Sequence, residues 1–183
     1  MSDITQQLED LGGPDPGRRA AAAALLYRAG CERAADVFAE WRKDPEFDVL
    51  VTGRPIVGVA VPPDLFVRIR QETGMPDLAE VPADQSTAEF EMNRGEIRLD
   101  ILTPVDGEGP IQKFLDRFGP GIQQVELPVA KVEQAGHILS ARFGLAAVYP
   151  EPRAGADGTR VNFYLVNAPA AGKLLIELFE AKR

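Results

Sequence analysis

GIQQVELPVAKVEQAGHILSARFG, residues 121–144, combines a strand pattern with a helix pattern. Residues 122–129 are predicted to form a strand, and residues 131–143 have the spacing of a helix that Gly144 ends. Three further strand-like runs follow at residues 145–149, 160–166 and 173–179. The second half of the chain is therefore predicted to contain a strand, a helix and three more strands.

The first half repeats this order, with a start roughly 65 residues earlier. Strands are predicted at residues 55–61, 78–81, 88–92 and 97–102, and a helix at residues 65–73 precedes Gly74. A linker helix, residues 110–118, joins the halves. We expect an α+β fold in which two tandem βαβββ modules, about 54–104 and 121–180, form a curved, open barrel-like mixed sheet around a pocket.

Residues 1–49 are predicted to be an N-terminal helical extension of the main domain, residues 50–183. The pattern favours helices at 4–11, 18–29 and 31–43, with a break at Gly30, and a short strand at 47–52. Amphipathic helices usually complete a core, so we expect the extension to pack on the main domain. A dimerisation or carrier-protein docking element is the alternative.

Composition excludes several classes of protein. The 183 residues are 45% hydrophobic and 26% charged, as in globular domains, and carry a formal net charge of −8. So acidic a chain predicts neither nucleic-acid binding nor attachment to anionic membranes. Cys31 is the single cysteine, which excludes an intramolecular disulfide. No secretory segment or membrane span is evident, so we expect a cytoplasmic protein, and the Ala, Arg, Gly and Pro content suggests a bacterium.

An ordered set of motifs resembles the methylmalonyl-CoA epimerase branch of the vicinal oxygen chelate superfamily. The second half supplies most of them: residues 121–125 (GIQQV), 149–155 (YPEPRAG), 158–163 (GTRVNF) and 175–178 (LIEL). The first half adds residues 71–74 (QETG), 84–85 (DQ), 102–104 (LTP) and 110–115 (PIQKFL). The resemblance covers almost all of residues 54–180.

The resemblance implies a divalent metal with two histidine ligands, and this sequence departs from that pattern. The two histidine positions fall on Ile56 and Gln124, and the remaining ligand positions fall on Asp100 and Glu177. Transition metals favour imidazole, whereas Mg²⁺ and Ca²⁺ favour oxygen. We therefore expect no cofactor. A weakly bound divalent metal on Asp100, Gln124 and Glu177 is the alternative.

The resemblance also implies two glutamates that remove and return a proton beside a thioester, and both positions are kept, as Glu89 and Glu177. Asp100, Gln124, Ile56 and Asn162 are the expected substrate-binding residues. His137, the single histidine, is expected to lie on the solvent side of its helix or to pack against the domain.

These positions predict a metal-independent isomerase, epimerase or cyclase that uses carboxylate acid/base chemistry on a carbonyl-activated small molecule. A thioester or a polyketide-type intermediate of biosynthesis is the expected substrate class. Residues 165–169 (LVNAP) replace a histidine- and lysine-bearing loop of the family, which bears on CoA recognition. The alternatives are a non-catalytic protein that sequesters an antibiotic, and a methylmalonyl-CoA-type epimerase with an oxygen-ligand metal site. Relatives often pair through sheet edges, so a homodimer is one alternative, and the sequence leaves the oligomeric state open.

Overall fold

The computed structural model describes residues 4–182, so residues 1–3 and 183 of the predicted extension and domain lie outside the described part. Contacts divide the described residues into two compact units. The first unit contains the residues up to Ala29 together with Ile56–Gln123, and the second contains Gly30–Pro55 together with the residues from Gln124 onward.

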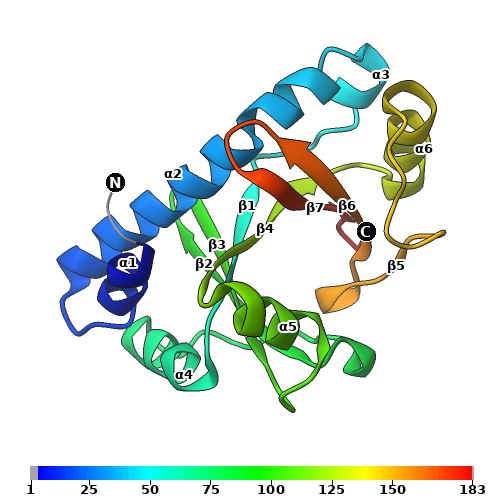
Figure 1. The fold of residues 1–183 in the computed structure, drawn as a ribbon. Helices are drawn as coiled ribbons and strands as arrows, with labels where there is room; N and C mark the ends of the chain where they lie inside the picture. Colours follow the sequence, from blue (N-terminus) through cyan, green and yellow to red (C-terminus); the bar gives the residue numbers. More distant parts are fainter. Residues whose placement is uncertain (1–3, 183) are drawn as a thin grey trace. The chain divides into compact units, whose positions relative to one another are not determined.

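The N-terminal segment is helical, with two differences from the sequence-based expectation. Helix α1, Ile4–Leu11, is where it was predicted, but α2, Pro16–Trp41, runs without a break through Gly30 (Figure 1). Residues 47–52 were predicted to be a strand, and this was wrong: α3, Pro45–Asp48, forms instead. Asp44 caps α3, because its side chain accepts hydrogen bonds from the backbone N–H groups of Glu46 and Phe47.

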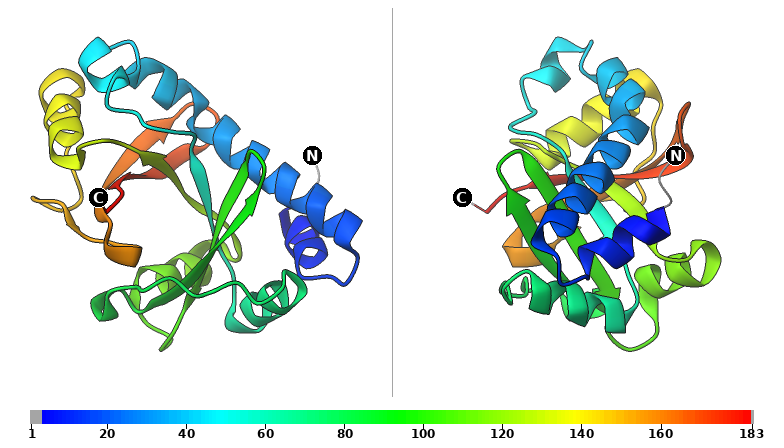
Figure 2. Two further views of the ribbon diagram at one scale, coloured as in Figure 1. Left: turned by 180° about the vertical axis from the view of Figure 1, so that it is seen from behind. Right: turned by 90° about the vertical axis from the view of Figure 1, so that its left-hand side faces the viewer.

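The first unit contains three neighbouring strands of a mixed sheet. Strand β3, Ile97–Pro104, lies between β2, Thr87–Arg94, and β1, Ile56–Ala60. Strand β2 is antiparallel to β3 and forms a hairpin with it (green in Figure 2), whereas β1 is parallel to β3. The helices of this region are α4, Pro63–Glu72, and α5, Gly109–Phe118, with a short 3-10 turn at Ala83–Gln85. The predicted strand at 78–81 does not form, although the Ala79 N–H donates to the Glu89 carbonyl over 3.0 Å.

One face of this sheet carries the core of the first unit. The side chains on it are fully buried: Val57, Val59, Phe90, Leu99 and Ile101. Helix α4 packs on this face, where the rings of Phe66 and Phe90 meet edge to face with centroids 5.0 Å apart. Helix α1 lies against α4, because Glu9 pairs with Arg68 over 3.0 Å. On the other face, Ile111 of α5 packs with Ala60 and Leu102.

The second unit contains four neighbouring strands of a mixed sheet, in the order β4-β7-β6-β5, except that residues 121–123 of β4 belong to the first unit. Its strands are β4, Gly121–Pro128, β5, Arg153–Ala154, β6, Arg160–Ala168, and β7, Gly172–Glu180. Strand β4 runs parallel to β7, and the other neighbours are antiparallel. Helix α6, Val132–Phe143, connects β4 to the rest, and a 3-10 turn forms at Ala156–Gly158. No strand forms at 145–149, although the Val148 N–H donates to the Phe163 carbonyl over 2.7 Å.

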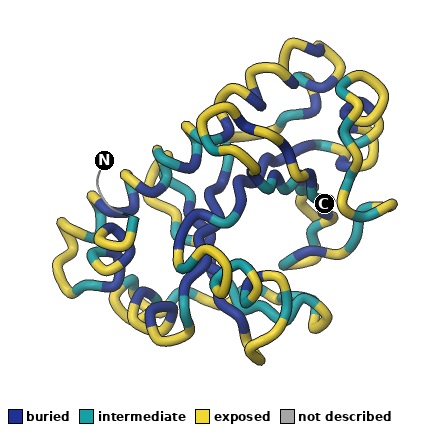
Figure 3. The backbone as a smooth tube through the Cα atoms, viewed as in Figure 1, coloured by how far each residue is buried: buried dark blue, intermediate teal, exposed yellow. Residues whose placement is uncertain are grey.

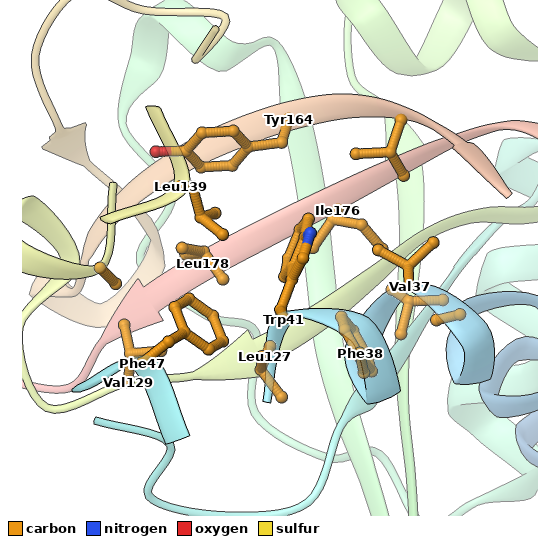
Figure 4. Packing of buried hydrophobic residues seen from close by; sticks show 14 of the residues in the cluster. Val37, Phe38, Trp41, Phe47, Leu127, Val129, Leu139, Tyr164, Ile176 and Leu178 are labelled. Atoms are coloured by element: carbon orange, nitrogen blue, oxygen red, sulfur yellow. The ribbon is translucent and has the colours of Figure 1, made fainter. Parts of the chain in front are cut away.

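Trp41, at the end of α2, is central to the core of the second unit (Figure 4). Its ring lies 5.9 Å from Phe38, 5.7 Å from Phe47 and 6.4 Å from Tyr164, measured between centroids. Leu127, Ile176 and Leu178 of the sheet and Leu139 of α6 complete this core. The extension therefore supplies core side chains, and its turns outside the packed stripe are exposed (yellow in Figure 3).

The α+β class is confirmed. The predicted elements that form follow the predicted order, but the strands at 47–52, 78–81 and 145–149 are missing and the two-residue strand β5 was not predicted. Strands β1 and β4 are almost wholly buried (dark blue in Figure 3), as expected of strands covered on both faces. Among the described helices, none has the length and apolar character that crossing a bilayer requires.

Candidate functional site

Glu177 lies on the sheet face of the second unit that is turned away from the Trp41 core. Strand register places Glu177 beside Glu126 of β4 on one side and Phe163 of β6 on the other. Residues that are paired in this way project from the same face, and their chain neighbours project from the opposite one. Accordingly, the adjacent Ile176 and Leu178 lie in the hydrophobic core, while Glu177 does not.

A glutamine side chain joins the two carboxylates. The Gln124 Nε2 atom donates to Glu177 Oε2 over 2.7 Å and to Glu126 Oε1 over 3.1 Å. Carboxylate oxygens accept hydrogen bonds, and the structure directs the amide nitrogen of Gln124, rather than its oxygen, toward both of them. Both N–H groups of Gln124 are therefore used to hold acidic side chains.

Glu126 is the site residue that sequence reasoning missed. The structure buries it to 7% exposure, the same value as Gln124, whereas Glu177 is half-buried. The signal was the alternation of Gln124, Val125, Glu126 and Leu127, which puts Glu126 on the face of Gln124. A carboxylate this far from water is costly unless it is hydrogen-bonded, which marks it as part of the site.

Aromatic side chains border the carboxylates of this unit. The Phe163 ring meets the Tyr149 ring edge to face with centroids 6.1 Å apart. The guanidinium carbon of Arg153 lies 4.8 Å from the centre of the Tyr149 ring, within the range of a cation–π contact. The face that carries Glu177 thus has an apolar and cationic border toward β5.

Asn162 lies on the opposite face of β6 from Phe163 and Glu177. It is buried, and its Nδ2 atom donates to the Tyr149 carbonyl over 3.0 Å, while its Oδ1 atom accepts from the Tyr149 N–H over 3.3 Å. The structure therefore gives this expected substrate-binding residue a supporting position: it fixes the backbone of the loop that carries the Tyr149 ring.

The first unit has its own acidic face. Register pairs Asp100 of β3 with Gly58 of β1 and with Glu91 of β2, and it pairs Glu89 with Leu102. All five residues therefore project from the face opposite the buried Val57 and Phe90. Ile56 lies two residues before Gly58 on β1, so its side chain is on the same face, where it is 5% exposed. Asp100 is 9% exposed and Glu89 is half-buried.

Glu91 differs from its neighbours on this face because it forms a surface ion pair. Arg98 donates to Glu91 Oε1 from Nε over 2.8 Å and from Nη2 over 2.6 Å, and both side chains are about one-third exposed. An exposed pair of this kind adds little to stability. We therefore assign Glu91 to the surface, which leaves Glu89 and Asp100 as the candidates of the first unit.

The residues at the metal positions do not fit an imidazole-rich centre. Ile56 offers no ligand atom, and Gln124 directs an N–H donor, not an oxygen, at the carboxylates. His137 is exposed on α6, the helix that packs into the Trp41 core. Among residues 4–182, no group of three or more His, Cys, Asp or Glu side chains is arranged to hold a metal ion.

Comparison with solved structures gives clear matches, although no family model and no curated protein matches the chain. Methylmalonyl-CoA epimerase of Mycobacterium tuberculosis is 33% identical with a TM-score of 0.60, over 73% of this chain and 91% of that chain. A hypothetical protein of Bacillus halodurans is 25% identical with a TM-score of 0.58, over 70% and 93% of the two chains. A Streptomyces coelicolor methylmalonyl-CoA epimerase variant in complex with 2-nitronate-propionyl-CoA is 24% identical with a TM-score of 0.58, over 73% and 99%. On the identity and coverage of the first of these, the chain belongs to the methylmalonyl-CoA epimerase family of the vicinal oxygen chelate superfamily.

Proposed function

We propose that the protein is an epimerase or a closely related isomerase that moves a proton at a carbon beside a carbonyl group, with Glu177 as the acid/base residue and without a metal. The observation that supports this most directly is the hydrogen bond from Gln124 to Glu177. It fixes the carboxylate of Glu177 on the sheet face that the core does not occupy. Orientation of this kind is what a general base requires.

The proposed chemistry follows from the groups present. Glu177 takes the proton from the substrate carbon, and the negative charge moves to the carbonyl oxygen. We assign Gln124 to positioning Glu177, because its two N–H groups are directed at carboxylates and not toward a substrate oxygen. Family resemblance assigns the return of the proton to Glu89, and Asp100 is proposed to orient the substrate.

The substrate class is proposed from the relatives. The Streptomyces coelicolor structure holds a CoA thioester analogue, and another solved epimerase, 24% identical, holds methylmalonyl-CoA. Without a metal to stabilise an enolate, the enzyme would act best on a carbon whose proton is already acidic, such as one flanked by two carbonyl groups. We therefore propose a 2-substituted malonyl-type thioester or a polyketide-type intermediate of biosynthesis as the substrate.

Deuterium exchange tests this proposal. The protein is incubated with methylmalonyl-CoA in D₂O, and incorporation at C2 is followed by mass spectrometry. We expect wild-type protein to catalyse exchange and Glu177→Gln to lose on the order of 10²–10⁴-fold in rate, the usual contribution of a general base. Glu133→Gln, which alters an exposed carboxylate of α6, is the matched control and should leave the rate unchanged.

Two results would contradict the proposal. Exchange by Glu177→Gln within tenfold of the wild-type rate would show that another group takes the proton. Tight binding of methylmalonyl-CoA with no exchange by the wild-type protein would favour sequestration of the ligand over catalysis.

A further inference from the structure

We infer that Glu126 is a positioning residue of this site: it holds the Gln124 carboxamide in the orientation that donates a hydrogen bond to Glu177. This inference rests on the proposed function for its catalytic consequence, but its structural part stands independently. Glu126 is not one of the two glutamates that the family resemblance supplies. Its role follows from the contacts of Gln124.

The geometry explains why Gln124 needs a second acceptor. A carboxamide that turns by half a rotation about its last bond exchanges its nitrogen and its oxygen. In the turned state the amide oxygen would face an ionised carboxylate, and two acceptors repel. Glu126 Oε1, 3.1 Å from the Gln124 nitrogen, accepts the other N–H and adds a second contact that the turned state would lose.

The position of Glu126 suits this role. It lies two residues after Gln124 on the same strand and is the register partner of Glu177 on the next strand. All three side chains therefore share one face with one amide nitrogen between two acids. Because Glu126 is 7% exposed, its hydrogen bond is less weakened by water than a surface contact would be.

The same arrangement accounts for the poor fit to a histidine-rich metal centre. A cation at this position would need the oxygen of Gln124 to face it, since an amide nitrogen is a donor and not a ligand. Two acceptors at hydrogen-bond distance favour the opposite orientation. Glu126 thus converts a family ligand position into a hydrogen-bond donor for the acid/base residue.

A double-mutant cycle on the rate of deuterium exchange tests the catalytic part. With methylmalonyl-CoA as the probe, Glu126→Ala should lower kcat about tenfold, the effect of losing one charged hydrogen bond, with KM changed less than twofold. Glu126→Gln keeps an acceptor oxygen of the same reach and should recover most of that loss. In the Gln124→Ala background, Glu126→Ala should cost less than a further twofold, because Glu126 acts through Gln124.

Additive losses in this cycle would overturn the inference, since they would show that Glu126 acts without Gln124. A rise in KM with kcat unchanged would also overturn it, because Glu126 would then contribute to substrate binding. A general loss of folding is separated from these effects by the thermal unfolding midpoint of each variant. If Glu126→Ala unfolds, Glu126→Met, which keeps the length of the side chain and removes the acceptor oxygens, takes its place in the cycle.

NMR tests the structural part without a substrate. The side-chain NH₂ signals of Gln124 are assigned by their disappearance in Gln124→Ala. In Glu126→Ala we expect these signals to move toward those of exposed glutamines and to exchange faster with water, whereas Glu133→Gln should leave them in place. If wild-type protein fails to catalyse exchange but the signals respond in this way, the proposed function is wrong and the positioning stands. If the signals do not respond, the positioning is wrong whatever the activity.

Discussion

Gly136 of α6 is the position at which a single methyl group should have a calculable effect. A Cβ atom added there would lie 2.5 Å from the Tyr164 hydroxyl oxygen and 3.9 Å from the ring carbon that carries it. The ring cannot move aside easily, because Tyr164 is 2% exposed and packs edge to face on Trp41. Gly136→Ala should therefore meet one atom in particular, the hydroxyl oxygen.

The magnitude follows from two opposing terms. Overpacking of a core costs about 1–3 kcal/mol, whereas alanine is favoured over glycine inside a helix by about 1 kcal/mol. The clash should dominate, with a net loss of up to about 2 kcal/mol. In a Tyr164→Phe background the nearest atom is at an ordinary contact distance, so the same substitution should become neutral or stabilise by up to about 1 kcal/mol.

Thermal unfolding of the four proteins in this cycle measures the effect. About 2–4 °C of Tm per kcal/mol is expected for a chain of this size, so Gly136→Ala should lower Tm by up to about 8 °C in the wild type and raise or preserve it in Tyr164→Phe. If Gly136→Ala destabilises both backgrounds equally, the Tyr164 hydroxyl is not the clashing group and the packing argument is refuted.

Three further predictions concern the second unit. Burial raises the pKa of the Tyr164 hydroxyl above its ordinary value of 10.0, so the unfolded chain releases this proton first and the free energy of unfolding should fall as pH rises above that value. In urea titrations, Tyr164→Phe should lose less of its free energy of unfolding at alkaline pH than the wild type. Asp44→Ala removes the cap of α3 and should lower the free energy of unfolding by about 1–2 kcal/mol in guanidinium titrations. Arg142→Ala, which removes only the half-exposed ion-pair partner of Asp44, should cost less, and equal losses would contradict the capping role. Asn162→Leu removes the side chain that hydrogen-bonds the Tyr149 backbone, so hydrogen exchange at the Tyr149 amide should accelerate on the order of 10–100-fold. Unchanged protection of this amide would show that other contacts hold the loop.

The regular elements were predictable where the sequence pattern was strong. The strands around residues 88–92, 97–102 and 173–179 and the helix that ends near Gly74 are present and slightly longer than predicted, and the helix that ends near Gly144 is present and one residue shorter. The prediction of helices and strands failed where one local sequence signal competed with another. Gly30 does not break α2, because one glycine inside a helix costs only about 1 kcal/mol and Leu26 and Ala34 on either side of it are buried.

The misplaced strands have equally local causes. Asp44-Pro45 is a helix-start signal, with a capping side chain and a proline at the first helical position, and it outweighs the apolar run that follows. Residues 78–81 and 145–149 each donate one backbone hydrogen bond to a neighbouring strand. Prolines close to both segments, among them Pro82 and Pro150, lack the N–H that would extend pairing.

The site was predictable in part. Family resemblance indicated Glu177, and strand register now gives it a partner on each side. The hydrogen bond between Gln124 and Glu177 could not be predicted, because 53 residues separate the two side chains and only strand register brings them together. Asn162 and Phe163 are adjacent on β6 and therefore face opposite sides of the sheet, which puts Asn162 in its supporting position and which a family motif alone does not reveal.

The division of the chain has a consequence for synthesis. From its N-terminus the chain contributes to the first unit, then the second, then the first and again the second. Trp41 emerges from the ribosome 137 residues before Leu178 (178 − 41), yet both belong to one hydrophobic cluster. At a synthesis rate of about 5–20 residues per second, the apolar side chains of α2 in this cluster would stay uncovered for roughly 7–27 s before the strands that cover them are made. We therefore expect the nascent chain to present these side chains to chaperones, and their exposure to set the yield of folded protein at high expression.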